Sequence, residues 1–105
     1  MGYDRLIRLS MGQLQAHIRQ LASNSAAVVI TPHAKSQMRK RGINVSLVYE
    51  SLREGRLLRR PEPSLQHGSL ECRMERYAAG KNCCVVAALS DETPNVVCVT
   101  VFYSN

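Results

Sequence analysis

The first third of the chain carries apolar residues at helical spacing, interrupted by one short apolar run. Between Met11 and Leu21 apolar residues recur every three or four positions, and Ser10 precedes them as an N-cap, so the pattern predicts a helix. His17 lies near the apolar stripe of this helix, where packing at the edge of the core is its expected role. The run AAVVI, which ends at Ile30, predicts a short buried strand.

Two short helices joined by a tight turn are predicted next. Thr31 is a suitable N-cap and Pro32 suits the first helical position, while Gly42 can end the helix in the left-handed conformation. A second helix is predicted from a cap at Asn44 to about Glu54. Each helix is amphipathic and is therefore expected to bury one stripe of side chains.

After Gly55 the pattern changes to that of strands. RLLRRPEP predicts an edge strand broken by two prolines, and SLECRMERY alternates between apolar and polar residues, as expected of a half-exposed antiparallel strand. CCVVAAL and VVCVTVFY are apolar on both faces and predict central strands. The sequence therefore predicts an α+β domain in which N-terminal helices pack on a twisted three- to four-stranded antiparallel sheet.

The length of 105 residues leaves room for a single domain with one modest core. We interpret residues 28–103 as that core and residues 1–27 as an N-terminal helical extension. No apolar run approaches the roughly 18 residues of a membrane span, and the N-terminus lacks the continuous apolar region of a signal peptide. The expected location is therefore the cytoplasm, without membrane association.

The four cysteines lie in apolar, strand-like contexts, and none is spaced as a C-x-x-C pair. Buried free thiols are the favoured interpretation, because adjacent residues of a strand point to opposite faces and cannot easily serve one metal. A zinc site that combines cysteines with histidines is the alternative. We predict no metal, no cofactor and, in a cytosolic setting, no disulfide. The residues concerned are Cys72, Cys83, Cys84, Cys98, His17, His33 and His67.

The formal net charge of +6 is concentrated in one part of the chain. The segment 31–60 holds eight cations and two anions and so carries the whole excess, because the charges elsewhere cancel. Such clustering is typical of a surface that meets phosphates, which makes nucleic acid the leading partner. A basic surface that meets an acidic protein or anionic lipid is the alternative. The candidate nucleic-acid contacts are Lys35, Arg39, Lys40, Arg41, Arg56, Arg59 and Arg60.

The helix predicted after Thr31 contains two candidate site residues. His33 occupies the second helical position, where unpaired backbone N–H groups and the helix dipole lower the proton affinity of an imidazole. It is either a base or hydrogen-bond donor, or a residue that organises the helix start by bonding a loop carbonyl. Arg41 lies between the polar and apolar stripes and is expected to be half-buried. Because the two lie about 12 Å apart along the helix axis, they cannot act on one atom.

The run HAKSQMRKRGI resembles the signature H-A-x-x-R-M-x-x-R-G-I of a small bacterial and phage domain family of uncharacterised type. That family is related to the BrnT, RelE and MqsR-like toxins, in the barnase–EndoU–colicin–RelE superfamily. Further matching landmarks are LREG in the next helix, the strand arginine Arg73 and the closing VCVTVFY. The likeness covers about residues 28–103 and departs from the signature at Gln37, where the pattern has arginine. The N-terminal helix resembles the arrangement in MqsR-like toxins.

The resemblance implies a RelE/BrnT-like fold and a toxin-like, metal-independent endoribonuclease that an antitoxin protein blocks. In this chemistry a ribose 2′-OH attacks its own phosphate, which requires a base, cations for the phosphorane and an acid for the leaving oxygen. The superfamily's catalytic residues vary between branches, so the fold carries over better than the active site. The candidates that the resemblance implies are His33 or His67 as base or acid, Arg41 and Arg73 as phosphate clamps, and Glu75 or Tyr103 as proton-transfer groups.

These candidates also have structural interpretations. For Arg73, which lies between two glutamates, the alternative is pairing with neighbours across the strands. For Tyr103 it is closure of the core, and for His67, beside a glycine, it is a place in a mobile loop. For the whole chain, the alternative is a non-catalytic module that binds nucleic acid or protein, such as a phage-type inhibitor or regulator, on the same fold.

Overall fold

The computed structural model describes residues 2–104 of the chain. It is an α+β structure with three α-helices, two short 3₁₀ helices and a six-stranded mixed sheet. The helical elements in chain order are η1 (Leu6–Arg8), α1 (Met11–Ala22), η2 (Ser25–Ala27), α2 (Pro32–Arg41) and α3 (Val45–Glu54). The strands are β1 (Val28–Ile30), β2 (Arg56–Leu57), β3 (Glu62–Ser64), β4 (Ser69–Ala78), β5 (Lys81–Ser90) and β6 (Thr93–Ser104).

The three α-helices begin at the caps that the sequence predicts. The hydroxyl of Ser10 accepts a hydrogen bond from the backbone of Gln13, whose side chain accepts one in return from the backbone N–H of Ser10, so α1 starts with a capping box. Thr31 caps α2, and Asn44 caps α3 in the same way. Gly42 ends α2 with a φ of 67°, a left-handed conformation that glycine adopts at little cost. The predicted helices are therefore confirmed.

The sheet is larger than predicted and is not purely antiparallel. Its order is β1-β6-β5-β4-β2, and β3 also pairs with β4. The prediction of three or four antiparallel strands was wrong for two reasons. First, the short strand β1 joins the sheet by pairing parallel to residues 96–98 of β6. Second, the proline-containing segment after Gly55 forms two separate short strands, β2 and β3, along the same edge of β4.

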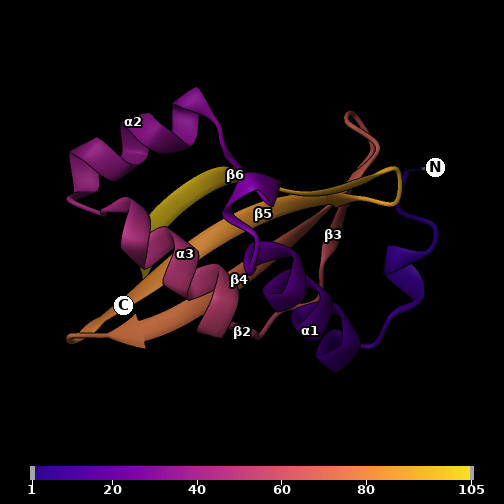
Figure 1. Cartoon of the computed structure of the whole chain (residues 1–105), viewed down its shortest axis with the longest axis horizontal. Helices are drawn as coiled ribbons and strands as arrows, with labels where there is room; N and C mark the ends of the chain where they lie inside the picture. Colours follow the sequence, from indigo (N-terminus) through magenta and orange to yellow (C-terminus); the bar gives the residue numbers. More distant parts are fainter. Residues whose placement is uncertain (1, 105) are drawn as a thin grey trace.

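Helices α1 and α3 lie across one face of this sheet, in front of the strands in Figure 1. One hydrophobic cluster joins Leu14 and Ile18 of α1 to Val48 and Leu52 of α3 and to the strands beneath them. The N-terminal extension, as far as the structure describes it (residues 2–27), thus shares its core with the rest of the chain. The sheet residues buried on this side include Leu70, Cys72, Met74, Val85, Ala87, Leu89, Val96, Cys98 and Val101.

The opposite side of the sheet, here called the open face, carries the alternate residues of the same strands. On β4 the alternation is as predicted, with buried residues facing the helices and partly exposed, more polar ones on the open face. Strands β5 and β6 present a mixture of small, apolar and polar side chains there. The open face comprises Glu71, Arg73, Glu75 and Tyr77 of β4, Asn82, Cys84, Val86 and Ala88 of β5, and Val97, Thr100 and Phe102 of β6.

Helix α2 runs beside the outer edge of β6, past the end of the short strand β1. There the side chains of Gln37 and Arg41 replace a neighbouring strand: Gln37 Oε1 accepts from the backbone N–H of Val101 at 2.8 Å, and Arg41 Nη1 donates to the carbonyl of Val101 at 3.2 Å. Arg41 was expected to be half-buried, and this was wrong, because its side chain reaches the strand edge from an exposed position. An arginine at position 37 has no acceptor to offer this N–H.

All four cysteines are buried free thiols, which confirms the favoured interpretation. Burial raises the pKa of Cys72 to about 12, with a smaller contribution from the Glu71 carboxylate, and burial alone raises that of Cys98 to about 12. The pKa values of Cys83 and Cys84 are also raised, chiefly by burial. The thiols therefore stay protonated at neutral pH and act as small apolar groups. Within the described residues, no helix is both long and apolar enough to cross a membrane.

Candidate functional site on the open face of the sheet

A compact polar cluster lies on the open face, centred on Arg73 and Glu75 of β4. Arg73 Nε lies 3.3 Å from Glu75 Oε2, and Asn82 Nδ2 donates to Glu75 Oε1 at 2.7 Å. Arg73 Nη2 donates to Cys84 Sγ at 3.4 Å, and its guanidinium carbon lies 4.9 Å from the centre of the Phe102 ring. We call these five residues, Arg73, Glu75, Asn82, Cys84 and Phe102, the sheet cluster.

The sheet cluster holds two charges in a largely desolvated setting. The Glu75 side chain is only 9% exposed and that of Arg73 is 17% exposed. Arg73 Nε is buried and, among the described residues, has no hydrogen-bond partner, because its contact with Glu75 lacks hydrogen-bond alignment. An ion pair of this kind costs desolvation energy that imperfect geometry recovers only in part. A buried charged pair with an unsatisfied N–H group is a candidate for function.

Two further arginines border the sheet cluster on its β2 side. Arg59 Nε lies 4.0 Å from Glu75 Oε2, and the Arg59 side chain is 65% exposed, so this pair is loose and screened by solvent. Arg56 pairs with Glu75 in the register of β2 and β4 and is exposed. Arg73 and Arg59 thus contact one carboxylate while Arg56 lies opposite it on β2, and this part of the open face is suited to an anion.

The structure brings together only two of the predicted catalytic residues, Arg73 and Glu75. His33 is exposed at the start of α2, beside β6, and two strand spacings separate β6 from β4. His67 is exposed in the turn between β3 and β4. Tyr103 pairs with Cys83 and therefore lies on the helix-covered side of the sheet, where Lys81 Nζ sits 4.8 Å from its ring centre. The predicted set does not form one site.

The predicted basic segment is also divided by the fold. Lys35, Arg39 and Lys40 are exposed on α2, at the β6 side of the sheet. Arg56, Arg59 and Arg60 are exposed at the other side, next to β4. Between them in sequence, Arg53 has a structural role, because its guanidinium donates to the carbonyl of Ala22 and to Ser25. The excess charge thus forms two separated groups, of which only the second adjoins the sheet cluster.

Three members of the sheet cluster, Asn82, Cys84 and Phe102, were not predicted from the sequence. The first two have a sequence signal, because the segment AAGKN indicates a turn between two strands. In the structure Ala79 and Gly80 form this two-residue turn, with positive φ values of 52° and 79°. Such a turn fixes the register of a hairpin and pairs Tyr77 with Asn82 and Glu75 with Cys84. Phe102 has no comparable signal.

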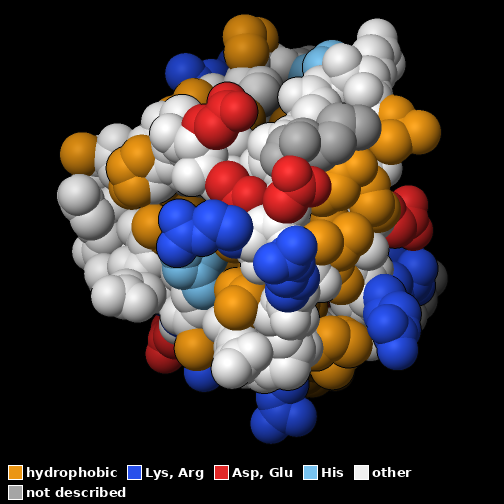
Figure 2. All heavy atoms as spheres, turned by 90° about the vertical axis from the view of Figure 1, so that its right-hand side faces the viewer, with side chains coloured by type: hydrophobic (Ala, Val, Ile, Leu, Met, Phe, Trp, Pro, Cys, Tyr) orange, Lys and Arg blue, Asp and Glu red, His pale blue; other side chains and the backbone are white. Residues whose placement is uncertain are grey.

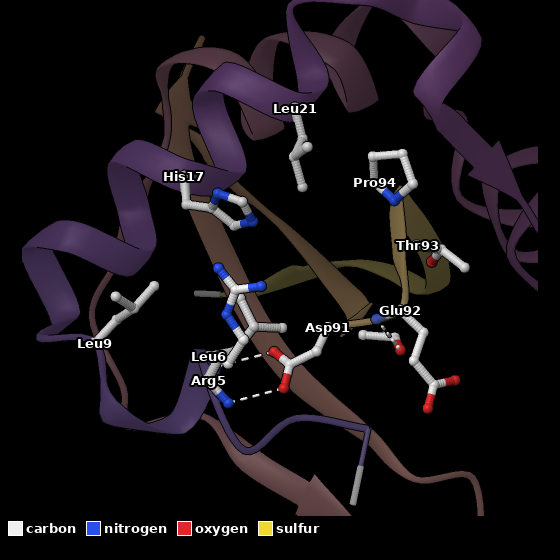
Figure 3. Close-up of a pocket in the computed structure, with 10 residues that line it drawn as sticks. Arg5, Leu6, Leu9, His17, Leu21, Asp91, Glu92, Thr93 and Pro94 are labelled. Carbon is white, nitrogen blue, oxygen red and sulfur yellow. Dashed lines mark hydrogen bonds between the residues drawn. The ribbon is translucent and has the colours of Figure 1, made fainter.

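Another hollow of the described structure lies far from this cluster. It measures about 530 Å³ and is formed between α1, the N-terminal segment and the turn from β5 to β6. In Figure 3, His17 and Arg5 point into it, and Asp91 accepts hydrogen bonds from the backbone N–H groups of Arg5 and Leu6 at 2.7 and 3.1 Å. Figure 2 views this end of the molecule, where acidic and basic side chains are mixed with apolar ones. Asp91 anchors the N-terminal segment, and His17 lies at the core boundary, as predicted.

A smaller hollow of about 380 Å³ adjoins the sheet cluster at the edge of β4. Glu75 and Asn82 line it together with side chains from the end of α3 and from β2. No group of three or more metal-ligating His, Cys, Asp or Glu side chains was found within residues 2–104. The chemistry that the cluster can offer by itself is therefore that of a carboxylate and several guanidinium groups, which bind anions and move protons.

These features define a class of protein: an α+β domain with helices on one sheet face and a charged cluster on the other. The model of a protein family matches residues 30–103, and the chain belongs to this family, which is described as "Domain of unknown function (DUF4258)". The match begins with the last residue of β1 and ends in β6, so it includes the whole sheet cluster. No curated protein and no solved structure matches the chain.

Proposed function

We propose that the chain is a toxin-like, metal-independent endoribonuclease of the RelE/BrnT type, with the sheet cluster as its active site. The observation that carries the proposal is the Arg73–Glu75 pair on the open face, a largely buried carboxylate with the guanidinium groups of Arg73 and Arg59 beside it. The resemblance of residues 28–103 to toxin-related domains supports it. On this proposal the protein acts on RNA in the cytoplasm, without a cofactor, and an antitoxin protein covers the open face to block it.

The proposed reaction is a transesterification within one RNA strand. The 2′-oxygen bonds to the adjacent phosphorus while the bond from phosphorus to the 5′-oxygen breaks, which leaves a 2′,3′-cyclic phosphate and a 5′-hydroxyl. Glu75 accepts the proton of the 2′-hydroxyl, and the leaving 5′-oxygen takes a proton from water. Arg73 and Arg59 stabilise the extra negative charge of the phosphorane, an effect that is strong where water is excluded.

A phosphate at this position would also change the Arg73–Glu75 contact. In the free protein the carboxylate holds the guanidinium, and both side chains lose hydration. An incoming phosphate offers Arg73 a second anion with bidentate geometry and frees Glu75 to accept a proton. This exchange of partners converts the resting pair into a phosphate-binding group, Arg73, and a base, Glu75.

The second candidate is a non-catalytic module that binds nucleic acid or protein through the same surface. It is favoured by the positions of the three histidines, which lie on α1, α2 and the β3–β4 turn and so supply no imidazole beside Glu75. This alternative predicts RNA or protein binding without turnover. The two candidates differ in one measurable outcome, the cleavage of the RNA backbone.

The test is incubation of the purified protein with end-labelled RNA in the presence of EDTA. We expect products with 2′,3′-cyclic phosphate ends, and growth arrest when the protein is expressed in bacteria. Arg73→Ala should lower kcat/KM by about a hundredfold or more, and Arg73→Lys, which keeps the charge but loses the planar fork, should also be impaired. Arg8→Ala is the matched control, because it removes one exposed cation on the remote N-terminal segment.

Intact RNA after incubation with the wild-type protein would refute the nuclease proposal and favour the binding module. Cleavage that EDTA abolishes would refute the metal-independent mechanism instead. If Arg73→Ala and Arg8→Ala reduce cleavage equally, the sheet cluster is not the active site. Circular dichroism of each variant separates a loss of chemistry from a loss of folding.

A further inference from the structure

The hollow beside the sheet cluster combines features of a site for a flat, polar ligand. It opens where β4 extends beyond its short partner β2, and its volume is about 380 Å³, within the range of small-ligand sites. Its walls come from three elements: Glu54 at the end of α3, Arg56 and Leu58 at and after β2, and Glu75, Arg76 and Tyr77 on β4. Asn82 of β5 forms its boundary with the sheet cluster.

We propose that this hollow is a nucleobase subsite that selects guanine next to the phosphate held by the sheet cluster. The proposal rests on the proposed function, because it places RNA on the open face, and it adds the residue that stacks the base and the residue that reads its edge. Tyr77 has the first role and Glu54 the second.

Tyr77 is the stacking platform. Its side chain is 73% exposed, which is unusual for a large aromatic residue and shows that the core does not need it. It lies on the same face of β4 as Glu75, two residues further on and therefore about 7 Å away along the strand. Leu58, which is 61% exposed, adds an apolar wall to the same hollow. Exposed aromatic rings of this kind bind unpaired bases by stacking.

The hollow offers carboxylate and amide acceptors beside two guanidinium groups, those of Arg56 and Arg76. Asn82 Nδ2 donates to Glu75 Oε1, and because a carboxylate only accepts, this bond fixes the orientation of the amide and leaves Asn82 Oδ1 as an acceptor. Glu54 is exposed, and its Oε2 lies 3.9 Å from Arg76 Nη2, so its carboxylate is only loosely paired. Arg56 supplies a cation on the β2 side, and Arg76, which lies beside the carboxylates of Glu50 and Glu54, supplies a second on β4.

This pattern matches one base better than the others. Guanine carries two adjacent donors on its Watson–Crick edge, N1–H and the N2 amino group, and a carboxylate can accept both at once. Its O6 is an acceptor that a guanidinium complements. Adenine and cytosine place an acceptor beside their amino group, and uracil has one donor between two acceptors, so each would set an acceptor against a carboxylate oxygen.

The experiment measures equilibrium binding of four fluorescently labelled tetranucleotides that differ at one central base. We expect the guanine oligonucleotide to bind about tenfold more tightly than the other three. Tyr77→Ala should weaken binding of all four about tenfold, because it removes stacking. Glu54→Gln should abolish the preference for guanine. Glu50→Gln is the matched control, since Glu50 also lies on α3 and pairs with Arg76, at 3.7 Å, but does not line the hollow.

Equal binding of the four oligonucleotides, or binding that Tyr77→Ala leaves unaltered, would overturn the proposed subsite. Loss of the guanine preference in Glu50→Gln as well as in Glu54→Gln would overturn the role of Glu54. Cleavage of the same oligonucleotides, measured separately, distinguishes the two proposals. Selective binding without cleavage supports the subsite and refutes the nuclease. Cleavage without base preference supports the nuclease and refutes the subsite.

Discussion

Two thiols buried between the sheet and its helices should make the fold sensitive to alkaline pH. Cys72 and Cys98 are 0% exposed, and burial raises the pKa of each from 9.0 to about 12. Below pH 9 both thiols are protonated in the folded and the unfolded chain. Between pH 9 and 12 only the unfolded chain releases these protons. Their contribution to stability is therefore fully present below pH 9 and is lost as the pH rises toward 12.

The size of this loss follows from the two pKa values. At pH 10 an unfolded thiol is largely ionised while the folded one is not, which lowers the free energy of unfolding by about 1.4 kcal/mol for each cysteine. The two together remove about 3 kcal/mol, a large share of the roughly 5–15 kcal/mol that stabilises a typical domain. Urea denaturation at pH 7.5 and pH 10, under reducing conditions, measures the difference.

Cys98→Ala should reduce this alkaline loss by about 1.4 kcal/mol, although the variant is less stable at both pH values because it leaves a cavity. The matched control is Val96→Ala, which removes buried volume two residues earlier on the same strand and face but leaves both thiols in place. It should keep the alkaline loss of the wild type. If the two variants lose equal stability between pH 7.5 and pH 10, burial of the thiol is not the cause of the pH dependence.

Two further predictions concern the backbone. A Cβ at Gly55 would lie 2.2 Å from the carbonyl oxygen of Ser51 and 2.9 Å from that of Glu75. Gly55→Ala should therefore destabilise the fold by about 2 kcal/mol or more. Gly12→Ala, in open space on α1, should instead stabilise it by up to about 1 kcal/mol. Thermal unfolding compares the two, and equal melting temperatures would contradict this account. Gln37→Ala should cost about 1–2 kcal/mol in urea denaturation, because it leaves the backbone N–H of Val101 without its acceptor, while Lys35→Ala on the exposed side of α2 should change stability by less than about 0.5 kcal/mol. A Gln37→Ala variant as stable as Lys35→Ala would show that water replaces the amide at this strand edge.

The helices could be predicted from the sequence because their signals are local. A cap, a proline at the first turn and a glycine stop act within a few residues, so Ser10, Thr31, Asn44 and Gly42 mark the observed ends. The sheet depends on pairings between distant segments. Three residues of β1 carry no sign that they pair parallel to β6, and the prolines after Gly55 indicate a broken edge strand without showing that both pieces pair with β4.

The charge pattern showed where the cations cluster in the sequence but not where they lie on the surface of the folded chain. Segment 31–60 runs from the β6 side of the sheet across the helix-covered face to the β4 side, so a single run of cations becomes two groups. In addition, Arg41 and Arg53 donate hydrogen bonds to backbone carbonyls of β6 and α1, respectively. A net charge therefore predicts a class of partner better than it predicts where that partner binds.

One extra residue in β6 decides which aromatic side chain joins the sheet cluster. Ala87 pairs with Cys98, but Val86 pairs with Thr100, so Val99 is left over as a bulge. Had the register before the bulge continued, Tyr103 would lie opposite Asn82 on the open face, where its hydroxyl could take part in proton transfer. The one-residue shift turns Tyr103 toward the helices and brings Phe102 over Arg73 instead. Because VVCVTVFY is apolar at nearly every position, its alternation gives no sign of this shift. The open face thus receives a ring that packs against the guanidinium and has no proton to give, which leaves Glu75 as the candidate proton-transfer group.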